Sequence, residues 1–160
     1  MASEIKFKRL TEVKPQDLIQ LMNNPLVKRQ MPLLTDSFSE KSYHSFIAAK
    51  ESLWRNHGYG PWAFYLEDSF IGWGGLQPED GDADLALVLH PNYWGMGKVI
   101  YEDILRIAFN EMGLASVTIL FPPTRTRIKG ILKLGFQKDR EVFIDKRPFI
   151  RYRLRRPSMN

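Results

Sequence analysis

The 160-residue sequence contains no cysteine. This absence excludes disulfide bonds, zinc sites with cysteine ligands and a cysteine acyl-enzyme, so any group transfer must use another nucleophile or proceed directly. Histidine is also scarce, and the three residues His44, His57 and His90 form neither an HxxH nor an HExxH spacing. We therefore expect no metal site.

Long apolar stretches are missing as well. No run approaches the roughly 18 residues of a membrane span, and the segment MASEIKFKRL lacks the apolar core of a signal peptide. We expect a cytoplasmic protein with no membrane partner. The composition, 44% hydrophobic and 26% charged, is that of a globular protein, and the length suits a single domain, 1–160.

Acidic residues are few near the end of the chain. Residues 121–160 hold 12 lysines and arginines against three acidic residues, whereas residues 1–120 hold 11 against 15. A basic end of this kind serves an anionic cofactor, nucleic acid or an acidic partner, or it forms a solvated strand face. Charge alone leaves these alternatives open.

Hydrophobic periodicity predicts a mixture of strands and helices. Strands are expected at 4–10, 84–90 and 115–121, with hairpins at 62–77 and at 141–155. Helices are expected at 14–22, at 37–54 behind a Ser37–Glu40 capping box, at 98–112 and at 125–135. Residues 78–83 are expected to be a loop and residues 91–97 a turn. The sequence therefore predicts one α+β domain whose central unit, 84–121, is strand–turn–helix–strand.

The turn contains two glycines, Gly95 and Gly97, in the segment HPNYWGMGK. Glycines at a helix start let a phosphate approach backbone N–H groups at the positive end of the helix dipole. A P-loop would need GxxxxGK[ST], and a dinucleotide-binding fingerprint would need a third glycine at position 100, where Ile100 stands. Neither motif is present, so the segment is either another kind of phosphate cradle or a plain strand-to-helix turn.

The segments HPNYWGMGK and ILKLGF resemble the PxYWGkG and kLGF motifs of the GNAT superfamily of acyl-CoA-dependent N-acyltransferases, and the likeness spans about residues 62–155. It is greatest to the branch of ribosomal-protein alanine acetyltransferases (RimJ/RimL-like). The resemblance implies a single-domain GNAT-like fold of class α+β. Such a fold has a mixed, mostly antiparallel, twisted sheet with a splayed parallel strand pair at its centre and helices flanking it.

The resemblance also implies a binding site for acetyl-CoA, with no metal. The pyrophosphate would lie on backbone N–H groups of the turn, and the pantetheine would pair with the splayed strand. Thr124 would hydrogen-bond the pantetheine, and Arg127 would pair with a cofactor phosphate. The remaining residues of this implied site are Leu87, Val88, Leu89, Trp94, Gly95, Met96, Gly97, Lys98 and Val99.

For catalysis, the resemblance implies direct transfer of the acetyl group from acetyl-CoA to a primary amine. The backbone N–H of Leu89 would polarise the carbonyl. Asp84 stands in the place of a family glutamate and is the candidate general base, with an exposed loop carboxylate as the alternative. His90 is a less favoured candidate for the same role.

The sequence departs from the family at the residue that protonates the leaving thiolate. The family tyrosine falls at Ile131, which cannot donate a proton. Water or another tyrosine, Tyr93 or Tyr101, would have to take its place, or catalysis would be weak.

Two functions are therefore expected as alternatives. One is an active N-acetyltransferase, a monomer or homodimer, whose acceptor is a small molecule or a protein N-terminus. An α-amine, with a pKa of about 7.7–8.0, loses its proton more easily than a lysine at about 10.4, which favours an N-terminal α-amine or another amine of low pKa. The other is a catalytically weak or silent CoA-binding or sensor protein, or an RNA- or ribosome-associated module. Nucleic acid is otherwise expected only as part of a ribosomal substrate.

Overall fold

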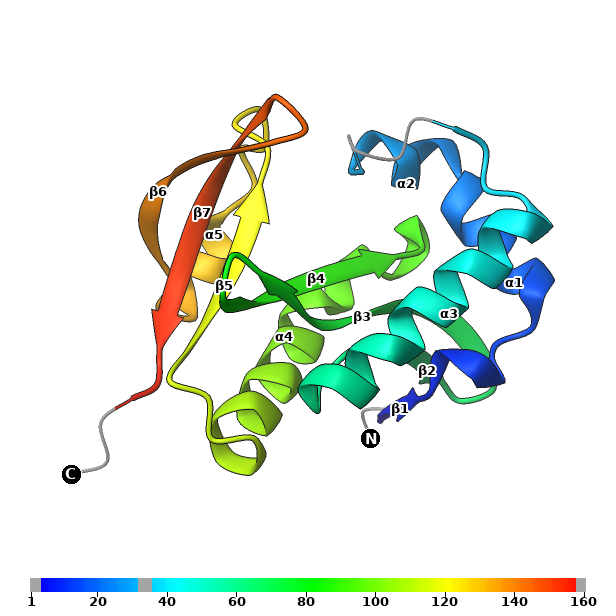
Figure 1. Ribbon diagram of the computed structural model, residues 1–160, viewed down its shortest axis with the longest axis horizontal. Helices are drawn as coiled ribbons and strands as arrows, with labels where there is room; N and C mark the ends of the chain where they lie inside the picture. The colour runs from blue at the N-terminus through cyan, green and yellow to red at the C-terminus, as the bar shows by residue number, and fades with distance from the viewer. Residues whose placement is uncertain (1–3, 32–35, 158–160) are drawn as a thin grey trace. The chain divides into compact units, whose positions relative to one another are not determined.

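The computed structural model describes residues 4–31 and 36–157, and Figure 1 shows its helices and strands. Within these residues the strands form a seven-stranded sheet in the order β1-β2-β3-β4-β5-β7-β6. The pairs β1–β2, β2–β3, β5–β7 and β6–β7 are antiparallel, whereas β4 and β5 are parallel. The prediction of a mixed, mostly antiparallel sheet with one parallel pair is confirmed.

The chain divides into two compact units, residues 1–77 with 87–97 and residues 78–86 with 98–160, so β3 and β4 contribute to both. The first unit contains β1 (Ile5–Lys8), η1 (Leu10–Glu12), α1 (Pro15–Asn23), α2 (Pro25–Arg29), α3 (Glu40–His57), β2 (Pro61–Leu66), most of β3 (Ser69–Glu79), the end of β4 (Asp82–Leu89) and η2 (Pro91–Met96). The second contains the start of β4, α4 (Gly97–Arg106) from its second residue onward, the π-helical turn η3 (Ile107–Glu111), β5 (Ser116–Phe121), α5 (Lys129–Lys133), β6 (Gln137–Ile144) and β7 (Arg147–Arg155).

The helices of the first unit share an apolar core with its strands. Their starts have a local cause: the Asn24 side chain accepts hydrogen bonds from two N–H groups of α2, and Ser39 Oγ accepts one from Ser42 at the start of α3. These caps satisfy N–H groups that a helix leaves free. The buried core residues are Leu10, Val13, Leu18, Leu21, Met22, Val27, Phe38, Tyr43, Ala63, Trp73 and Val88.

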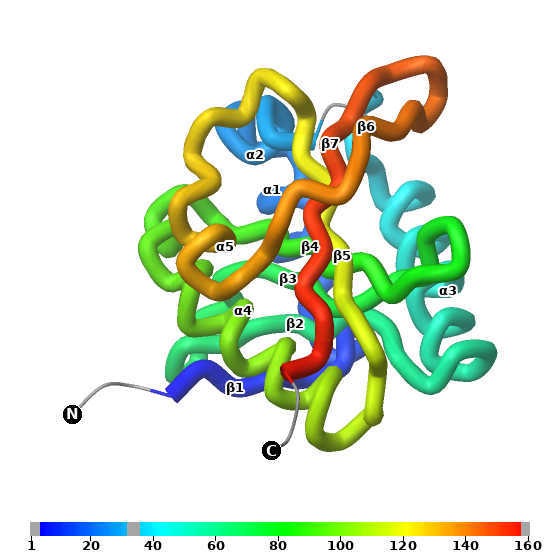
Figure 2. Tube along the Cα trace, turned by 90° about the vertical axis from the view of Figure 1, so that its left-hand side faces the viewer, coloured from blue at the N-terminus to red at the C-terminus, as the bar shows by residue number. Residues whose placement is uncertain are grey.

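In the second unit, β5, β7 and β6 run side by side (Figure 2). The β6–β7 turn has positive φ at Asp145 (50°) and Lys146 (65°). The β3–β4 turn has positive φ at Asp80 (55°) and Gly81 (86°). Positive φ at both central positions is the type I′ geometry that matches the twist of antiparallel strands. The predicted loop at 78–83 was therefore wrong, because this tight turn lets both strands continue almost to it.

Helix boundaries also differ from the prediction. The N-cap of α3 is Ser39, so the predicted Ser37–Glu40 capping box does not form, and the helix runs on to His57, where Gly58 adopts a φ of 73°. Helix α2 was not predicted, although Asn24 followed by Pro25 is a helix-start signal. The helix expected at 98–112 becomes π-helical after Arg106, where the Met112 N–H donates to the Ile107 carbonyl oxygen at 2.9 Å.

The end of β4 is fixed by a close approach of β3. A Cβ atom on Gly72 would lie 2.2 Å from the Val88 carbonyl oxygen and 2.9 Å from Leu89 Cα. The His90 N–H donates to the Ile71 carbonyl oxygen at 2.9 Å. Only a glycine at position 72 permits this contact, which holds the segment that leads into η2.

Candidate active site

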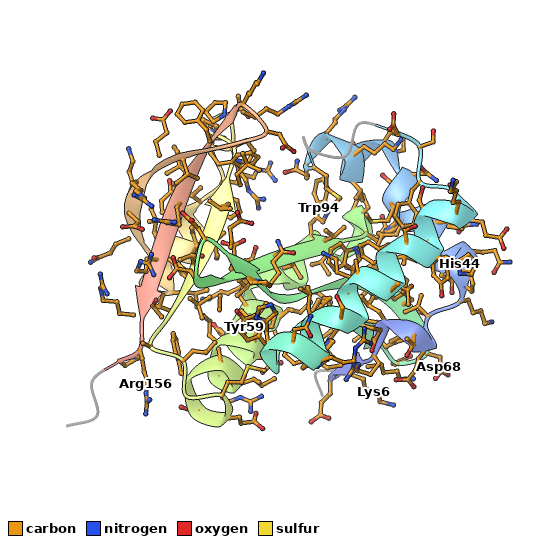
Figure 3. The ribbon with its side chains drawn as sticks, viewed as in Figure 1. Lys6, His44, Tyr59, Asp68, Trp94 and Arg156 are labelled. Atoms are coloured by element: carbon orange, nitrogen blue, oxygen red, sulfur yellow. The ribbon has the colours of Figure 1, made fainter. Side chains whose placement is uncertain are left out.

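The end of β4 and the η2 segment form one local structure in the first unit. Val88 and Leu89 are buried. Trp94 lies at the end of β4 (Figure 3), where its indole Nε1 donates to the Leu89 carbonyl oxygen at 2.9 Å. This bond anchors the predicted cofactor-binding segment to the strand that carries the predicted oxyanion donor.

The predicted turn at 91–97 is helical. Pro91 begins the 3-10 helix η2, which leads directly into α4, and His90 Nδ1 accepts a hydrogen bond from the Asn92 N–H at 3.1 Å. This capping bond gives the His90 side chain a structural role. The Gly97 N–H donates to the Trp94 carbonyl oxygen, so an anion bound here would share that N–H group in a three-centre bond.

Neither glycine of this segment is required by the fold. Gly97 has ordinary helical angles, φ −57° and ψ −41°, and φ at Gly95 lies outside the left-handed region. A Cβ on Gly95 would meet no atom within 4 Å, and one on Gly97 would lie 3.6 Å from Leu87 Cδ2, an ordinary contact. Glycine costs about 1 kcal/mol relative to alanine inside a helix. Both glycines are explained by a need for space beside the backbone. A phosphate group suits this space, because it binds to backbone N–H groups at a helix start.

The start of α4 carries no acidic residue in its first turn, although acidic side chains are the usual stabilisers of that position. Lys98 is exposed there, and Val99 is 50% exposed. The positive end of the helix dipole and a lysine ammonium therefore meet at an open surface. This arrangement is electrostatically suited to an anion.

Asp84 lies in the second unit at the residue pair where β4 and β5 meet in parallel, Asp84 with Thr118. It is only 3% exposed, and its Oδ1 accepts a hydrogen bond from Thr118 Oγ1 at 2.8 Å. The alternative of an exposed loop carboxylate is therefore wrong. Burial raises the pKa of Asp84 to about 7, which exceeds the lowering effects of the Thr118 hydrogen bond and the Arg151 charge.

The second oxygen of Asp84 receives no hydrogen bond from the residues that the structure describes. Among those residues, every buried side-chain nitrogen or oxygen has a hydrogen-bond partner. The Oδ2 atom of Asp84 therefore retains access to solvent. A carboxylate with one anchored and one accessible oxygen, and a pKa near neutral, is suited to accept a proton.

Two aspartates and two arginines surround this part of β4. Arg153 donates to both carboxylate oxygens of Asp82, at 2.8 and 3.0 Å, and Arg151 Nε donates to Asp139 at 2.9 Å. The hydrogen bond from Arg153 lowers the pKa of Asp82. Burial by itself raises the pKa of Asp139, but hydrogen bonds from both arginines outweigh it and the net shift is downward. Asp82 thus stays ionised while Asp84, on the same strand, can exchange a proton.

The other predicted residues of the second unit lie around α5. Thr124 and Arg127 are exposed, and Ile131 is buried, so the residue at the family's tyrosine position serves packing. Gly130 resembles Gly95, because a Cβ there would meet no atom within 4 Å and its φ is not left-handed. The Arg125 guanidinium lies 4.2 Å from the centroid of the Phe121 ring.

The part of the chain that the structure describes contains no group of three or more histidine, cysteine, aspartate or glutamate side chains that could hold a metal ion. None of its helices is long and apolar enough to cross a membrane.

Asp84→Asn is expected to make stability depend less on pH. The pKa of Asp84 is near 7 in the folded protein, against 3.8 for an ordinary aspartate. Between these two pH values the folded state binds the Asp84 proton and the unfolded state does not. The free energy of unfolding of the wild type therefore falls as pH rises from about 4 to about 7, and it is constant above pH 7. The asparagine variant does not titrate, so its free energy of unfolding at pH 8 should exceed that of the wild type by up to about 4 kcal/mol. Urea unfolding between pH 5 and pH 8 measures the difference. Asp68→Asn, at an exposed carboxylate, is the control, and an equal gain at both pH values would contradict the assignment.

Comparison with known proteins adds the family. The family model described as acetyltransferase (GNAT) domain matches residues 6–137. No curated protein sequence matches the chain significantly. Among solved structures, an acetyltransferase from Agrobacterium tumefaciens strain C58 is similar, with a TM-score of 0.78 and 15% identity over 96% of this chain and 92% of that chain.

Two further structures share the fold. A proposed ribosomal-protein-serine acetyltransferase from Vibrio cholerae has a TM-score of 0.75 and 15% identity, over 97% of this chain and 95% of that one. The Campylobacter jejuni N-acetyltransferase PseH, solved in complex with acetyl coenzyme A, has a TM-score of 0.65 and 17% identity, over 96% and 100%. Because the family model covers most of the chain, the protein belongs to the GNAT acetyltransferase family.

Proposed function

We propose that this protein is an acetyl-CoA-dependent N-acetyltransferase that transfers an acetyl group directly to a primary amine, and that residues 1–160 act as one N-acyltransferase domain. The observation that carries the proposal is the pair of glycines at the start of α4, which the fold does not require and which leave the backbone open to a ligand. The acetyl coenzyme A complex of PseH supports the same cofactor, because the two chains share a fold.

Acetyl-CoA would supply the acetyl group as a thioester. We propose that its pyrophosphate binds at Gly95–Val99, beside the Lys98 ammonium, and that its pantetheine follows Leu87–Leu89. Thr124 and Arg127 would contact the pantetheine and a phosphate, as the family resemblance implies. Exposed Arg127 and Lys129, next to open Gly130, suit the anionic ADP end.

The chain's own groups would then handle charge and protons. The Leu89 N–H would donate to the carbonyl oxygen, on which negative charge develops during transfer. Asp84 would accept the proton that the attacking amine loses, directly or through a water molecule. Its anchored Oδ1 and accessible Oδ2 support this role.

For the proton that the leaving sulfur needs, we propose Tyr101 in place of the tyrosine that Ile131 replaces. Burial raises the pKa of Tyr101, Arg125 opposes the shift, and the Asp84 charge adds to it. A tyrosine in this environment stays protonated at neutral pH and can donate. Tyr93, the other candidate, lies in η2 with its ring 6.2 Å from that of His90.

The acceptor is proposed to be an amine of low pKa, of which an N-terminal α-amine is one example. The Vibrio cholerae structure, named for a ribosomal-protein substrate, gives limited support to the RimJ/RimL-like branch at 15% identity. The protein is proposed to act in the cytoplasm as a monomer or homodimer.

The direct test follows free CoA released from acetyl-CoA across a panel of primary amines, beside the thermal shift caused by acetyl-CoA alone. We expect stabilisation by acetyl-CoA and release stimulated by one class of amine. Asp84→Asn should lower kcat by roughly 10²- to 10⁴-fold and remove the pH dependence of kcat near pH 7, whereas Asp68→Asn should retain activity.

Stabilisation by acetyl-CoA without release of CoA in the presence of any amine would indicate a CoA-binding or sensor protein. Salt-sensitive RNA binding with no acetyl-CoA affinity would indicate a nucleic-acid module.

Gly95→Ala is expected to weaken acetyl-CoA binding without loss of stability. Its Cβ meets no protein atom within 4 Å, so it would take space proposed for the ligand, and we expect Kd to rise about tenfold or more. Calorimetric titration and thermal unfolding measure the two effects. Gly72→Ala is the converse control, because its Cβ would lie 2.2 Å from the Val88 oxygen and should cost about 1–3 kcal/mol. Unchanged affinity in Gly95→Ala would remove the observation on which the proposal depends.

A further inference from the structure

Lys50 is a partly buried cation that the proposed chemistry does not use. It lies on α3, which crosses strands β2 and β3 in Figure 1. Its Nζ lies 5.3 Å from the centroids of both the Phe46 ring and the Trp73 ring. Its Nζ donates a hydrogen bond to a neutral group, Gln77 Oε1, at 3.2 Å. The lysine is therefore held by aromatic faces and an amide.

None of the ion pairs of the described residues includes Lys50, and burial alone lowers its pKa. The residues outside the described part of the chain contain no aspartate or glutamate. A partly buried ammonium without a counter-ion is costly, and two of its three N–H donors remain for solvent or a ligand.

Trp73, one of the two rings beside Lys50, is packed in the core. Trp73 is 4% exposed, its Nε1 donates to Met22 Sδ at 3.3 Å, and its ring meets the Phe46 ring edge-to-face at 5.0 Å. Lys50 keeps some exposure, so a small anion can reach its ammonium. A fixed, accessible and uncompensated cation has the properties of an anion-binding group.

This cation lies in the same unit as Leu89, the proposed donor to the acetyl carbonyl oxygen. Trp73 follows Gly72, whose backbone contacts Val88 and Leu89, and Trp73 and Val88 belong to one core cluster. An anion held at Lys50 would thus be bound over the strand that contacts the Leu89 segment. A molecule with an amine near Leu89 and an anionic group at Lys50 would meet both.

We propose that Lys50 binds a carboxylate on the acceptor, so that the substrate of this enzyme is a primary amine that also carries a carboxylate. The inference rests on the proposed acetyl transfer and specifies its substrate class. The carboxylate can belong to a free amino acid or to the side chain of an acidic N-terminal residue of a peptide. The recognition chemistry, a charge-assisted hydrogen bond to the ammonium, is the same for both.

The test compares acids with their amides, and kcat/KM is expressed per unprotonated amine, because a neighbouring carboxylate also raises the pKa of the amine. The first arm pairs glycine with glycinamide and β-alanine with β-alaninamide, and the second pairs the dipeptide Asp-Ala with Asn-Ala. We expect higher kcat/KM for the acid in at least one arm, which also names the source. Lys50→Met should lower kcat/KM for the acid roughly 10- to 100-fold and leave the amide unchanged. Lys41→Met, an exposed lysine on the same helix, is the control. An equal loss for acid and amide would show a structural role and overturn the proposal.

A binding measurement decides the matter if no compound in the panel is acetylated. In protein labelled with 13C-lysine, the Lys50 side-chain signals are followed by NMR while the same acids and amides are added in the presence of CoA. We expect a saturable shift with an acid and none with its amide, and absence of any shift would overturn the proposal. Failure of the proposed function would show separately, as a wild-type protein that does not bind acetyl-CoA at all.

Discussion

The hydrogen bond between Asp84 and Thr118 holds the candidate general base at the junction of the two parallel strands. It lies where β4 and β5 meet in parallel, and it fixes one oxygen of a buried carboxylate while the other keeps access to solvent. Arg151 and Arg153 form hydrogen-bonded ion pairs with the neighbouring aspartates, Asp139 and Asp82. The hydrogen-bond partner of Asp84 is instead a neutral hydroxyl, that of Thr118. The protein retains a carboxylate that burial disfavours at neutral pH, which is a common feature of catalytic groups.

The glycines separate into those that the fold needs and those that it does not. Gly72 permits a backbone contact that no other residue allows, and Gly58 and Gly81 adopt left-handed angles. Gly95 and Gly97 do neither, and they lie where a helix dipole, Lys98 and an exposed valine meet. Gly72 shapes the end of β4, and Gly95 and Gly97 leave the segment that follows open to a ligand. The glycines at both places therefore shape the segment that is proposed to bind the cofactor.

Most of the fold could be predicted from the sequence because period, caps and turns are local signals. The strand–helix–strand centre, the closing hairpin and the α+β class followed from them. The type I′ turn at Asp80–Gly81 was missed because acidic residues beside a glycine suggested a loop, and α2 because it is only five residues long. Asp84 could be named from a resemblance, but its burial, its Thr118 partner and its raised pKa depend on a strand distant in sequence. Lys50 offered no signal at all, since its missing counter-ion is a property of the tertiary structure.

We propose that the backbone at the start of α4 binds the phosphates of coenzyme A. Backbone amide NMR, with coenzyme A, 3′-phospho-ADP and pantetheine added separately, tests it most directly. The account predicts that the amide signals of residues 95–99 shift with coenzyme A and with 3′-phospho-ADP, and stay in place with pantetheine. Binding of coenzyme A that leaves these five signals unchanged would contradict it.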